Sequence, residues 1–313
     1  MKGLFEHKSP LFQFGILMFI FLVGLIFASL AATVTGFVTS QFADGADTSD
    51  LQFFNLHFSM VLSDLFAFFL PAVLTAYLCC QYPSKWLKTK TKPRPSAFLF
   101  AILMMIFMTP TVEIAGFLNL KLTLPEFMAP IETFIRNLED MAGELTQTML
   151  NRKDIISFIT NLLVIGVLAG IVEEFLFRGA LMSIIRRKIT NPHVAVIIVA
   201  AIFSAVHFQF YGFLPRMILG VLLGYMLVLS GNIWVPVTAH FFNNAVAVIM
   251  VYTGISDTTE QTVLVSDTTT PAGWALASAI ALCGIIITYY CAKKLTNFSV
   301  STRNRDRDIS REQ

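Results

Sequence analysis

Eight long apolar runs divide the chain, and they constrain its fold more than any other feature. They cover about residues 12–37, 58–80, 97–118, 156–185, 193–210, 213–230, 233–254 and 273–292. A helix needs about 20 apolar residues to span a bilayer. The 313 residues are 56% hydrophobic and only 13% charged, whereas soluble domains are about 25% charged. The sequence therefore predicts an all-α, polytopic membrane protein with about eight transmembrane helices.

The charged residues between these runs alternate in sign along the chain. Basic residues follow the second, fourth and eighth runs: Lys85, Lys88, Lys90, Lys92 and Arg94, then Arg186, Arg187 and Lys188, then Lys293, Lys294, Arg303 and Arg305. Acidic residues occupy loops on the other side: Asp44, Asp47 and Asp50, then Asp257, Glu260 and Asp267. The positive-inside rule puts the basic loops and both termini in the cytoplasm. We expect a multi-pass protein of the plasma membrane, with the first run retained as a span because it is too long for a signal peptide.

One stretch between the third and fourth runs has the pattern of an amphipathic helix. Its apolar residues recur at intervals of three and four: Phe127, Ile131, Phe134, Leu138, Met141 and Leu145. The positions between them hold Glu132, Arg136, Glu139, Asp140 and Glu144, so the helix is too polar to span. Two interpretations are open: an interfacial helix packed on the bundle, and a cover that gates substrate access.

The fourth run contains charged residues at positions that would lie in hydrocarbon. Glu173, Glu174 and Arg178 fall in the stretch Ile-Val-Glu-Glu-Phe-Leu-Phe-Arg. Placing one such charge at the centre of a bilayer costs at least ~2.5 kcal/mol, so intramembrane charges indicate function. Glu174 and Arg178 are four residues apart and can pair on one helix face. Glu173 lies about 100° further around the helix.

Two later runs carry polar partners for these charges. Phe203 and His207 are four residues apart, as are His240 and Asn244. A rise of about 1.5 Å per residue puts them at depths compatible with Glu173. Packing alone explains poorly why three neighbouring spans hold two carboxylates, an arginine, two histidines and an asparagine. A carboxylate held dry beside a water is suited to general-base chemistry, so we predict one active site.

The ordered motifs Glu-Glu-x-x-x-Arg, Phe-x-x-x-His and His-x-x-x-Asn resemble those of the CPBP family, also called Abi. This family includes the type II CAAX prenyl endopeptidases. The resemblance covers about residues 156–254 and implies an all-helical intramembrane endopeptidase with a water-accessible cavity. It implies a protease that hydrolyses a peptide bond of a membrane-embedded or lipid-anchored protein or peptide, with the bilayer as its other partner and no nucleic acid.

The resemblance also implies a role for each motif residue. Glu173 would activate the water, His207 would hold it, and His240 and Asn244 would stabilise the oxyanion. Glu174, Arg178 and Phe203 would support these groups. A zinc ion would use Glu173, His207 and His240, but the chain has no His-Glu-x-x-His helix. We therefore favour a metal-free reaction with no cofactor.

Two other function classes are considered beside the protease. A proton-coupled transporter would use Asp64, Glu113, Glu173 and the histidines as a relay, although the chain lacks the internal repeat typical of transporters. A non-catalytic bacteriocin-immunity or interaction protein would keep the fold and act by binding. Asp64 and Glu113 lie outside the family motifs and receive no assigned role.

The expected organisation has three parts. Residues 1–155 hold the N-terminal transmembrane helices and the outer amphipathic helix, and residues 156–254 form the catalytic core. Residues 255–313 hold the last transmembrane helix and a cytoplasmic tail. The four cysteines have neither zinc-site nor disulfide-framework spacing, which indicates that they are packing residues.

Overall fold

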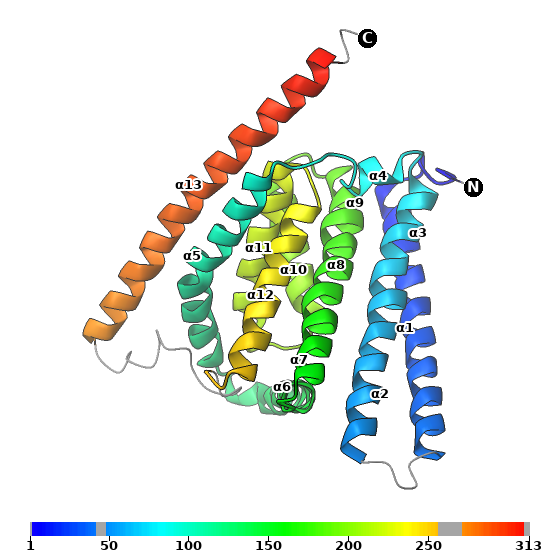
Figure 1. Cartoon of the computed structure of the whole chain (residues 1–313), viewed down its shortest axis with the longest axis vertical. Helices are drawn as coiled ribbons and strands as arrows, with labels where there is room; N and C mark the ends of the chain where they lie inside the picture. The colour runs from blue at the N-terminus through cyan, green and yellow to red at the C-terminus, as the bar shows by residue number, and fades with distance from the viewer. Residues whose placement is uncertain (1, 42–47, 256–270, 310–313) are drawn as a thin grey trace. The chain divides into compact units, whose positions relative to one another are not determined.

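The computed structural model describes residues 2–41, 48–255 and 271–309, and the side chains of residues 2–41, 49–255 and 272–296. All regular elements in these ranges are helical, and none is a strand (Figure 1). The all-α class is therefore confirmed for the described part of the chain. The acidic residues Asp44, Asp47, Asp257, Glu260 and Asp267, which the topology prediction used, lie outside it.

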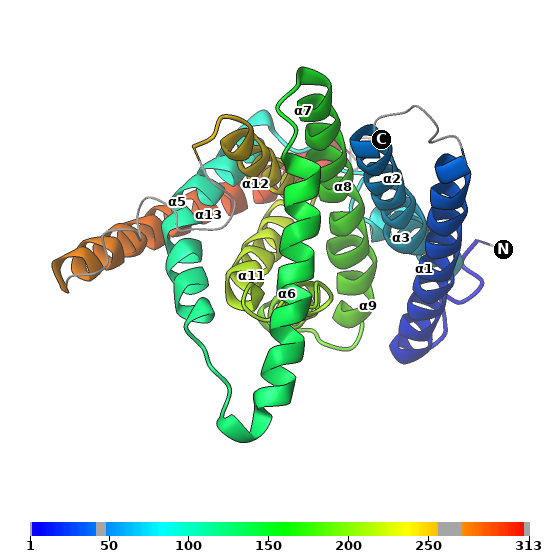
Figure 2. The ribbon, with the colours of Figure 1, turned by 90° about the horizontal axis from the view of Figure 1, so that it is seen from below.

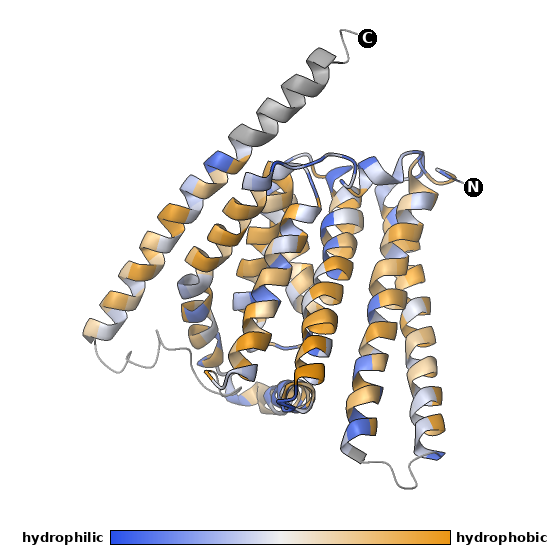
Figure 3. Cartoon of the chain, in the orientation of Figure 1, coloured by the Kyte–Doolittle hydropathy of each residue, from blue (hydrophilic) through white to orange (hydrophobic). Residues whose placement is uncertain are grey.

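Seven helical segments are long and apolar enough to cross a membrane. They are Pro10–Gln41, Ser49–Cys79, Pro95–Leu120, Ile155–Arg186, Phe213–Ser230, Trp234–Tyr252 and Ala272–Thr296. They correspond to seven of the eight predicted runs, and Figure 3 shows that apolar residues dominate along their lengths. The chain is a multi-pass membrane protein.

The fifth predicted span is shorter than the sequence indicated. The apolar run covers residues 193–210, but α10 (Pro192–Ala205) has only 14 residues. At 1.5 Å per residue it is about 21 Å long, less than the ~30 Å hydrocarbon core. The chain leaves the helix after Ala205 and reaches a left-handed conformation at Phe208, where φ is 54°. The Ser204 hydroxyl donates to the Phe213 carbonyl at 2.7 Å, which bridges this turn.

The described chain divides into two compact units. The first comprises Met1–Thr89, Leu145–Asn191 and His240–Ile255, and the second comprises Lys90–Glu144, Pro192–Ala239 and Ser256–Gln313. The first holds α1 (Pro10–Gln41), α2 (Thr48–Ser63), η1 (Asp64–Phe69), α3 (Leu70–Cys79), α4 (Pro83–Trp86), α7 (Ile155–Asn161), η3 (Leu162–Leu168), α8 (Ala169–Glu174), η4 (Phe175–Leu181) and α9 (Met182–Arg186). The second holds α5 (Pro95–Leu120), η2 (Glu126–Met128), α10, α11 (Phe213–Ser230) and α13 (Pro271–Ile309). Two helices, α6 (Ala129–Leu150) and α12 (Trp234–Tyr252), contribute residues to both units.

Close backbone contact joins the first helices of the first unit. The span α2–η1–α3 packs along α1, and η1 also packs against α8. A Cβ added to Gly24 would lie 1.9 Å from the Phe66 carbonyl oxygen, so only glycine allows this contact. Membrane helices use small residues in this way because lipid provides no hydrophobic drive for their association. Phe69 and Phe175 add a ring contact between η1 and η4, with centroids 5.6 Å apart.

Close backbone contact at a glycine also joins two helices of the second unit. α13 packs along α5, where a Cβ added to Gly284 would lie 2.0 Å from the Phe107 carbonyl oxygen. α10 packs on α11, and α11 packs on α5. The Asn119 side chain closes the end of α5: its Nδ2 donates to the Phe210 carbonyl at 2.9 Å, and its Oδ1 accepts from the Leu214 amide at 2.7 Å.

The predicted amphipathic helix is present as α6, preceded by the short η2. Figure 1 shows α6 end-on and Figure 2 shows it lengthwise, so within the second unit it lies across the ends of α5 and α11. Its apolar side chains are exposed, among them Ile131, Phe134 and Met141. Its polar side makes the contact inward, because Glu139 accepts from the Tyr211 amide at 3.2 Å. An outward apolar face is typical of a helix that lies in a membrane interface.

A salt bridge strengthens the polar side of α6. Arg136 donates to the Glu132 carboxylate at 2.6 Å and lies over the Tyr211 ring. The hydrogen bonds from Arg136 and from the Leu124 amide hold the pKa of Glu132 below its usual range. The carboxylate oxygen that accepts from Arg136 also accepts from the Tyr211 hydroxyl at 3.4 Å.

The charge distribution predicts that Lys85 and Asp140 lie on opposite sides of the membrane. We expect Lys85→Cys, in a protein whose four native cysteines are replaced by alanine, to react with an impermeant maleimide only after cells are opened. Asp140→Cys should react in intact cells, because one span, α5, separates the two positions. Both side chains are exposed. If only Lys85→Cys reacts in intact cells, the protein has the opposite orientation in the membrane. If both cysteines react equally in intact cells, α5 does not cross the membrane.

Candidate functional site

The helix that carries the glutamate pair begins at a well-capped end. Asp154 precedes α7, and its carboxylate accepts hydrogen bonds from the amide and the hydroxyl of Ser157 at 2.9 and 2.7 Å. These bonds lower the pKa of Asp154 to about 2. Asp is a preferred N-cap, and its charge also favours the positive end of the helix dipole. The sequence showed this signal, an Asp directly before an apolar run, but the prediction did not use it.

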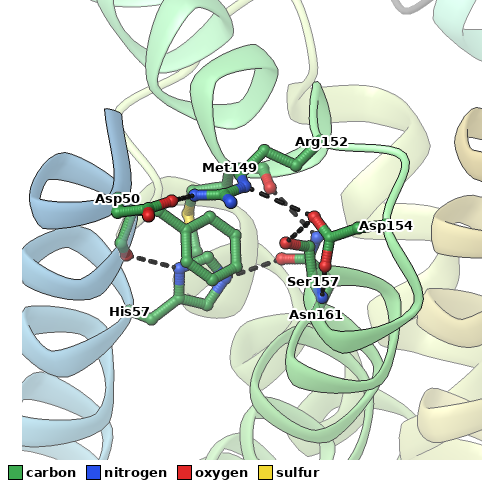
Figure 4. Close-up of polar contacts among 8 residues, drawn as sticks. Asp50, His57, Met149, Arg152, Asp154, Ser157 and Asn161 are labelled. Atoms are coloured by element: carbon green, nitrogen blue, oxygen red, sulfur yellow. Dashed lines mark hydrogen bonds and ion pairs between the residues drawn. The ribbon is translucent and has the colours of Figure 1, made fainter. Parts of the chain in front are cut away.

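A polar cluster joins this helix end to α2 (Figure 4). The His57 Nε2 lies 2.7 Å from Oδ1 of Asn161, whose Nδ2 donates to the Met149 carbonyl at 3.0 Å. Arg152 bonds both Asp154, at 3.4 Å, and Asp50 of α2. His57 and Asn161 are buried, so these bonds satisfy polar groups that would otherwise be costly in lipid. Sequence analysis missed this cluster because its members are about 100 residues apart.

Glu174, Arg178 and His240 form a buried charged cluster in the first unit. Arg178 Nη1 donates to Glu174 Oε1 at 2.8 Å, so the pair predicted from their spacing is present. The side chains of both residues are completely buried. His240 Nδ1 lies 2.9 Å from the same Glu174 oxygen. One carboxylate oxygen therefore contacts both the guanidinium and the imidazole, and this links α12 to α8.

Glu173 has a different environment from its neighbour. Its Oε2 lies 3.8 Å from His240 Nε2, beyond hydrogen-bond length. Its side chain is 17% exposed, whereas that of Glu174 is fully buried. His240 thus lies between the two carboxyl groups, with one ring nitrogen toward each.

Asn244 lies one turn beyond His240 on α12. Its Nδ2 donates to the Ile165 carbonyl in η3 at 2.9 Å, and its Oδ1 accepts from Asn243 at 3.3 Å. The amide nitrogen carries two hydrogens, so one of them is engaged by Ile165. The π-helical turn at η3 is the local feature that accompanies this backbone contact.

Phe203 and His207 belong to the second unit. Phe203 is buried in α10, and its ring meets that of His207 edge-on, with centroids 5.2 Å apart. His207 lies beyond the end of α10, so the predicted helical stripe stops short of it. Its Nδ1 is 2.8 Å from the Phe203 carbonyl, a contact that fixes the ring on the end of the helix. The convergence of His207 with Glu173 stays a prediction.

The two carboxylates outside the family motifs, Asp64 and Glu113, belong to different units. Asp64 starts η1, is 6% exposed, and its Oδ2 has no hydrogen-bond partner among the described residues. Its helix η1 packs on α8, which carries Glu173 and Glu174. Glu113 lies on α5 in the second unit and is half-buried. Asp64 is thus a neighbour of the glutamate pair that the motifs did not include.

Among the described residues of either unit, no three His, Cys, Asp or Glu side chains gather as ligands of a metal ion. Glu173 and His240 share the first unit, whereas His207 belongs to the second.

Comparison with known proteins gives one family and one relative. Residues 155–246 match the family described as type II CAAX prenyl endopeptidase Rce1-like. The chain is 29% identical over 123 residues to the uncharacterized protein YpbD of Bacillus subtilis (strain 168), which covers 38% of this chain and 58% of YpbD. No solved structure matches.

The buried cluster predicts that removing one charge of the Glu174–Arg178 pair destabilises the protein more than removing both. We expect Glu174→Gln to destabilise the protein by about 3–5 kcal/mol, because it leaves Arg178 buried without its counter-charge. The double variant Glu174→Gln, Arg178→Met should be more stable than the single one, since it removes both charges. Thermal unfolding in detergent measures the difference. If the double variant instead loses as much stability as the two single variants together, the two side chains do not interact.

Proposed function

Residues 155–246 of this chain form a domain of the Rce1-like type II CAAX prenyl endopeptidase family, and on this premise we propose that the protein is an intramembrane endopeptidase. It hydrolyses a peptide bond of a membrane-embedded or lipid-anchored protein or peptide. The family domain lies within the predicted catalytic core, residues 156–254, apart from its first residue. The observation that carries the proposal is the position of His240 between two carboxyl groups of unequal exposure.

Glu173 is the proposed general base. It is the partly exposed member of the pair, whereas Glu174 is fully buried and accepts from Arg178. Water can reach it, and a water that touches both Glu173 and His240 would bridge the 3.8 Å between them. Glu173 takes one proton from this water as its oxygen attacks the scissile carbonyl. The same proton then passes to the departing amine when the C–N bond breaks.

Glu174 is a positioning residue in this scheme. Its Oε1 receives both Arg178 and His240, so it orients the imidazole rather than the water. A His240 ring that is protonated at both nitrogens donates to Glu174 from Nδ1 and presents Nε2–H to the substrate side. The two carboxylates and two cations then sum to zero charge, which is the arrangement that buried charges require.

His240 and Asn244 are the proposed donors to the oxyanion. Preorganised donors of this kind stabilise the charge that develops on the carbonyl oxygen. Asn244 has a second amide hydrogen beyond the one given to Ile165. His207, oriented by its bond to the Phe203 carbonyl, is the proposed second holder of the water. We also propose that the protein lies in the plasma membrane with both termini cytoplasmic.

Replacing each of the two glutamates separately with glutamine tests these roles. We expect Glu173→Gln to lower turnover of a reporter peptide by about 10²–10⁴-fold, because it removes the base and keeps the size. Unfolding temperature should change little. Glu174→Gln should lose stability first and keep measurable turnover per folded molecule. Near-normal turnover by Glu173→Gln, with a well-folded but inactive Glu174→Gln, would reverse the assignment.

We propose that the reaction uses no metal. Only Glu173, His207 and His240 are candidate zinc ligands, and Asn244 suits a hydrogen-bond donor better. Purified protein should keep its turnover after dialysis against a strong chelator, with a zinc endopeptidase treated in parallel as the positive control. Stoichiometric zinc whose removal stops turnover, and whose return restores it, would refute this.

A further inference from the structure

The second unit contains an apolar groove that the proposed catalysis does not use. It has a volume of about 730 Å³ and lies between α5, α11 and α13. Met104 of α5 and Leu222 of α11 are among its apolar side chains. The volume falls within the ~300–1,000 Å³ typical of small-molecule sites. The lining is almost wholly apolar, so the groove fits hydrocarbon.

Polar side chains collect toward one end of the helices that form the groove. Lys293 lines it from α13, and its ammonium group lies 4.8 Å from the Tyr289 ring centre. His193 lines it from the start of α10, and its Nδ1 is 2.7 Å from the Tyr225 hydroxyl. Both residues neighbour basic loops that the topology prediction puts in the cytoplasm. This end of the groove therefore offers a cation and hydrogen-bonding groups at the predicted cytoplasmic surface.

A buried hydroxyl also lines the groove. Thr288 is 8% exposed, and its Oγ1 has no hydrogen-bond partner among the described residues. A helical threonine in lipid normally bonds a carbonyl of the preceding turn, as Thr296 does to Ala292 at 3.0 Å on the same helix. The missing bond at Thr288 costs stability unless a ligand supplies an acceptor.

We propose that this groove binds an anionic glycerophospholipid of the bilayer. Its acyl chain lies between α5, α11 and α13, an ester carbonyl accepts from Thr288, and its phosphate pairs with Lys293. The two side chains are five residues apart, about 7.5 Å along the helix, which suits the order of ester and phosphate in such a lipid. Basic pockets between membrane helices on the cytoplasmic side are suited to lipid head groups.

The lining favours a lipid over a peptide. A peptide strand or coil buried in this groove would need donors and acceptors for its backbone at every residue. The groove offers one buried hydroxyl and, at its end, Lys293, His193, Tyr225 and Thr296. A hydrocarbon chain needs no partners along its length, so the polar groups at one end are sufficient for it.

Native mass spectrometry of the purified full chain tests the proposal. The probes are phosphatidylglycerol and phosphatidylcholine of identical acyl chains, each added to the protein in detergent. We expect one phosphatidylglycerol to be retained preferentially. Lys293→Gln should lower that retention by about fivefold, the effect of one basic side chain, and should lower retention of phosphatidylcholine less, because the choline cation offsets the charge of its phosphate. Lys294→Gln is the matched control, because Lys294 neighbours Lys293 but does not line the groove.

Two more variants separate the hydroxyl from the charge. Thr288→Val keeps the shape and should reduce retention of both lipids. Thr109→Val is its control, because the Thr109 hydroxyl already bonds the Met105 carbonyl and lies outside the groove. Equal effects of Lys293→Gln and Lys294→Gln, no preference for phosphatidylglycerol, or retention of peptide instead of lipid would each overturn the proposal. None of these results depends on peptidase activity.

Discussion

The first unit is arranged around charges that a membrane helix would not otherwise tolerate. Glu174 and Arg178 are fully buried, and each would be costly without the other. A single oxygen of Glu174 receives both Arg178 and His240. This three-way contact joins α8 and η4 to α12. Because Glu174 accepts from Arg178 and is fully buried, Glu173 is the partly exposed carboxylate near His240.

Close backbone packing joins the helices within each unit. Lipid tails are as apolar as leucine, so burying apolar side chains does not by itself bring membrane helices together. The chain instead brings backbone against backbone at Gly24 and Gly284, where any side chain would collide with a carbonyl oxygen. The aromatic contact of Phe69 with Phe175 fills the space on the side where η1 meets η4.

Three π-helical segments interrupt the two spans that carry the buried carboxylates. η1 begins at Asp64, and η3 and η4 flank α8, which carries Glu173 and Glu174. A π-helical turn holds more residues than an α-helical one, and such turns are frequent at functional sites. Each therefore shifts the following side chains around the helix axis. Asp64 lies at the start of η1, which packs on α8, the helix that carries Glu173 and Glu174.

The sequence alone determined the features that depend on local spacing. The lengths of the apolar runs predicted eight spans, of which seven are long enough in the structure, and the i, i+4 spacing predicted the Glu174–Arg178 pair. The order of the motifs indicated the family over about residues 156–254, and the family model matches residues 155–246. Only the tertiary structure decided that His240 lies between Glu173 and Glu174, that α10 ends before His207, and that α6 turns its polar side inward. Spacing along a helix is set by covalent geometry, whereas contacts between helices depend on their rotation and on the close packing of particular side chains.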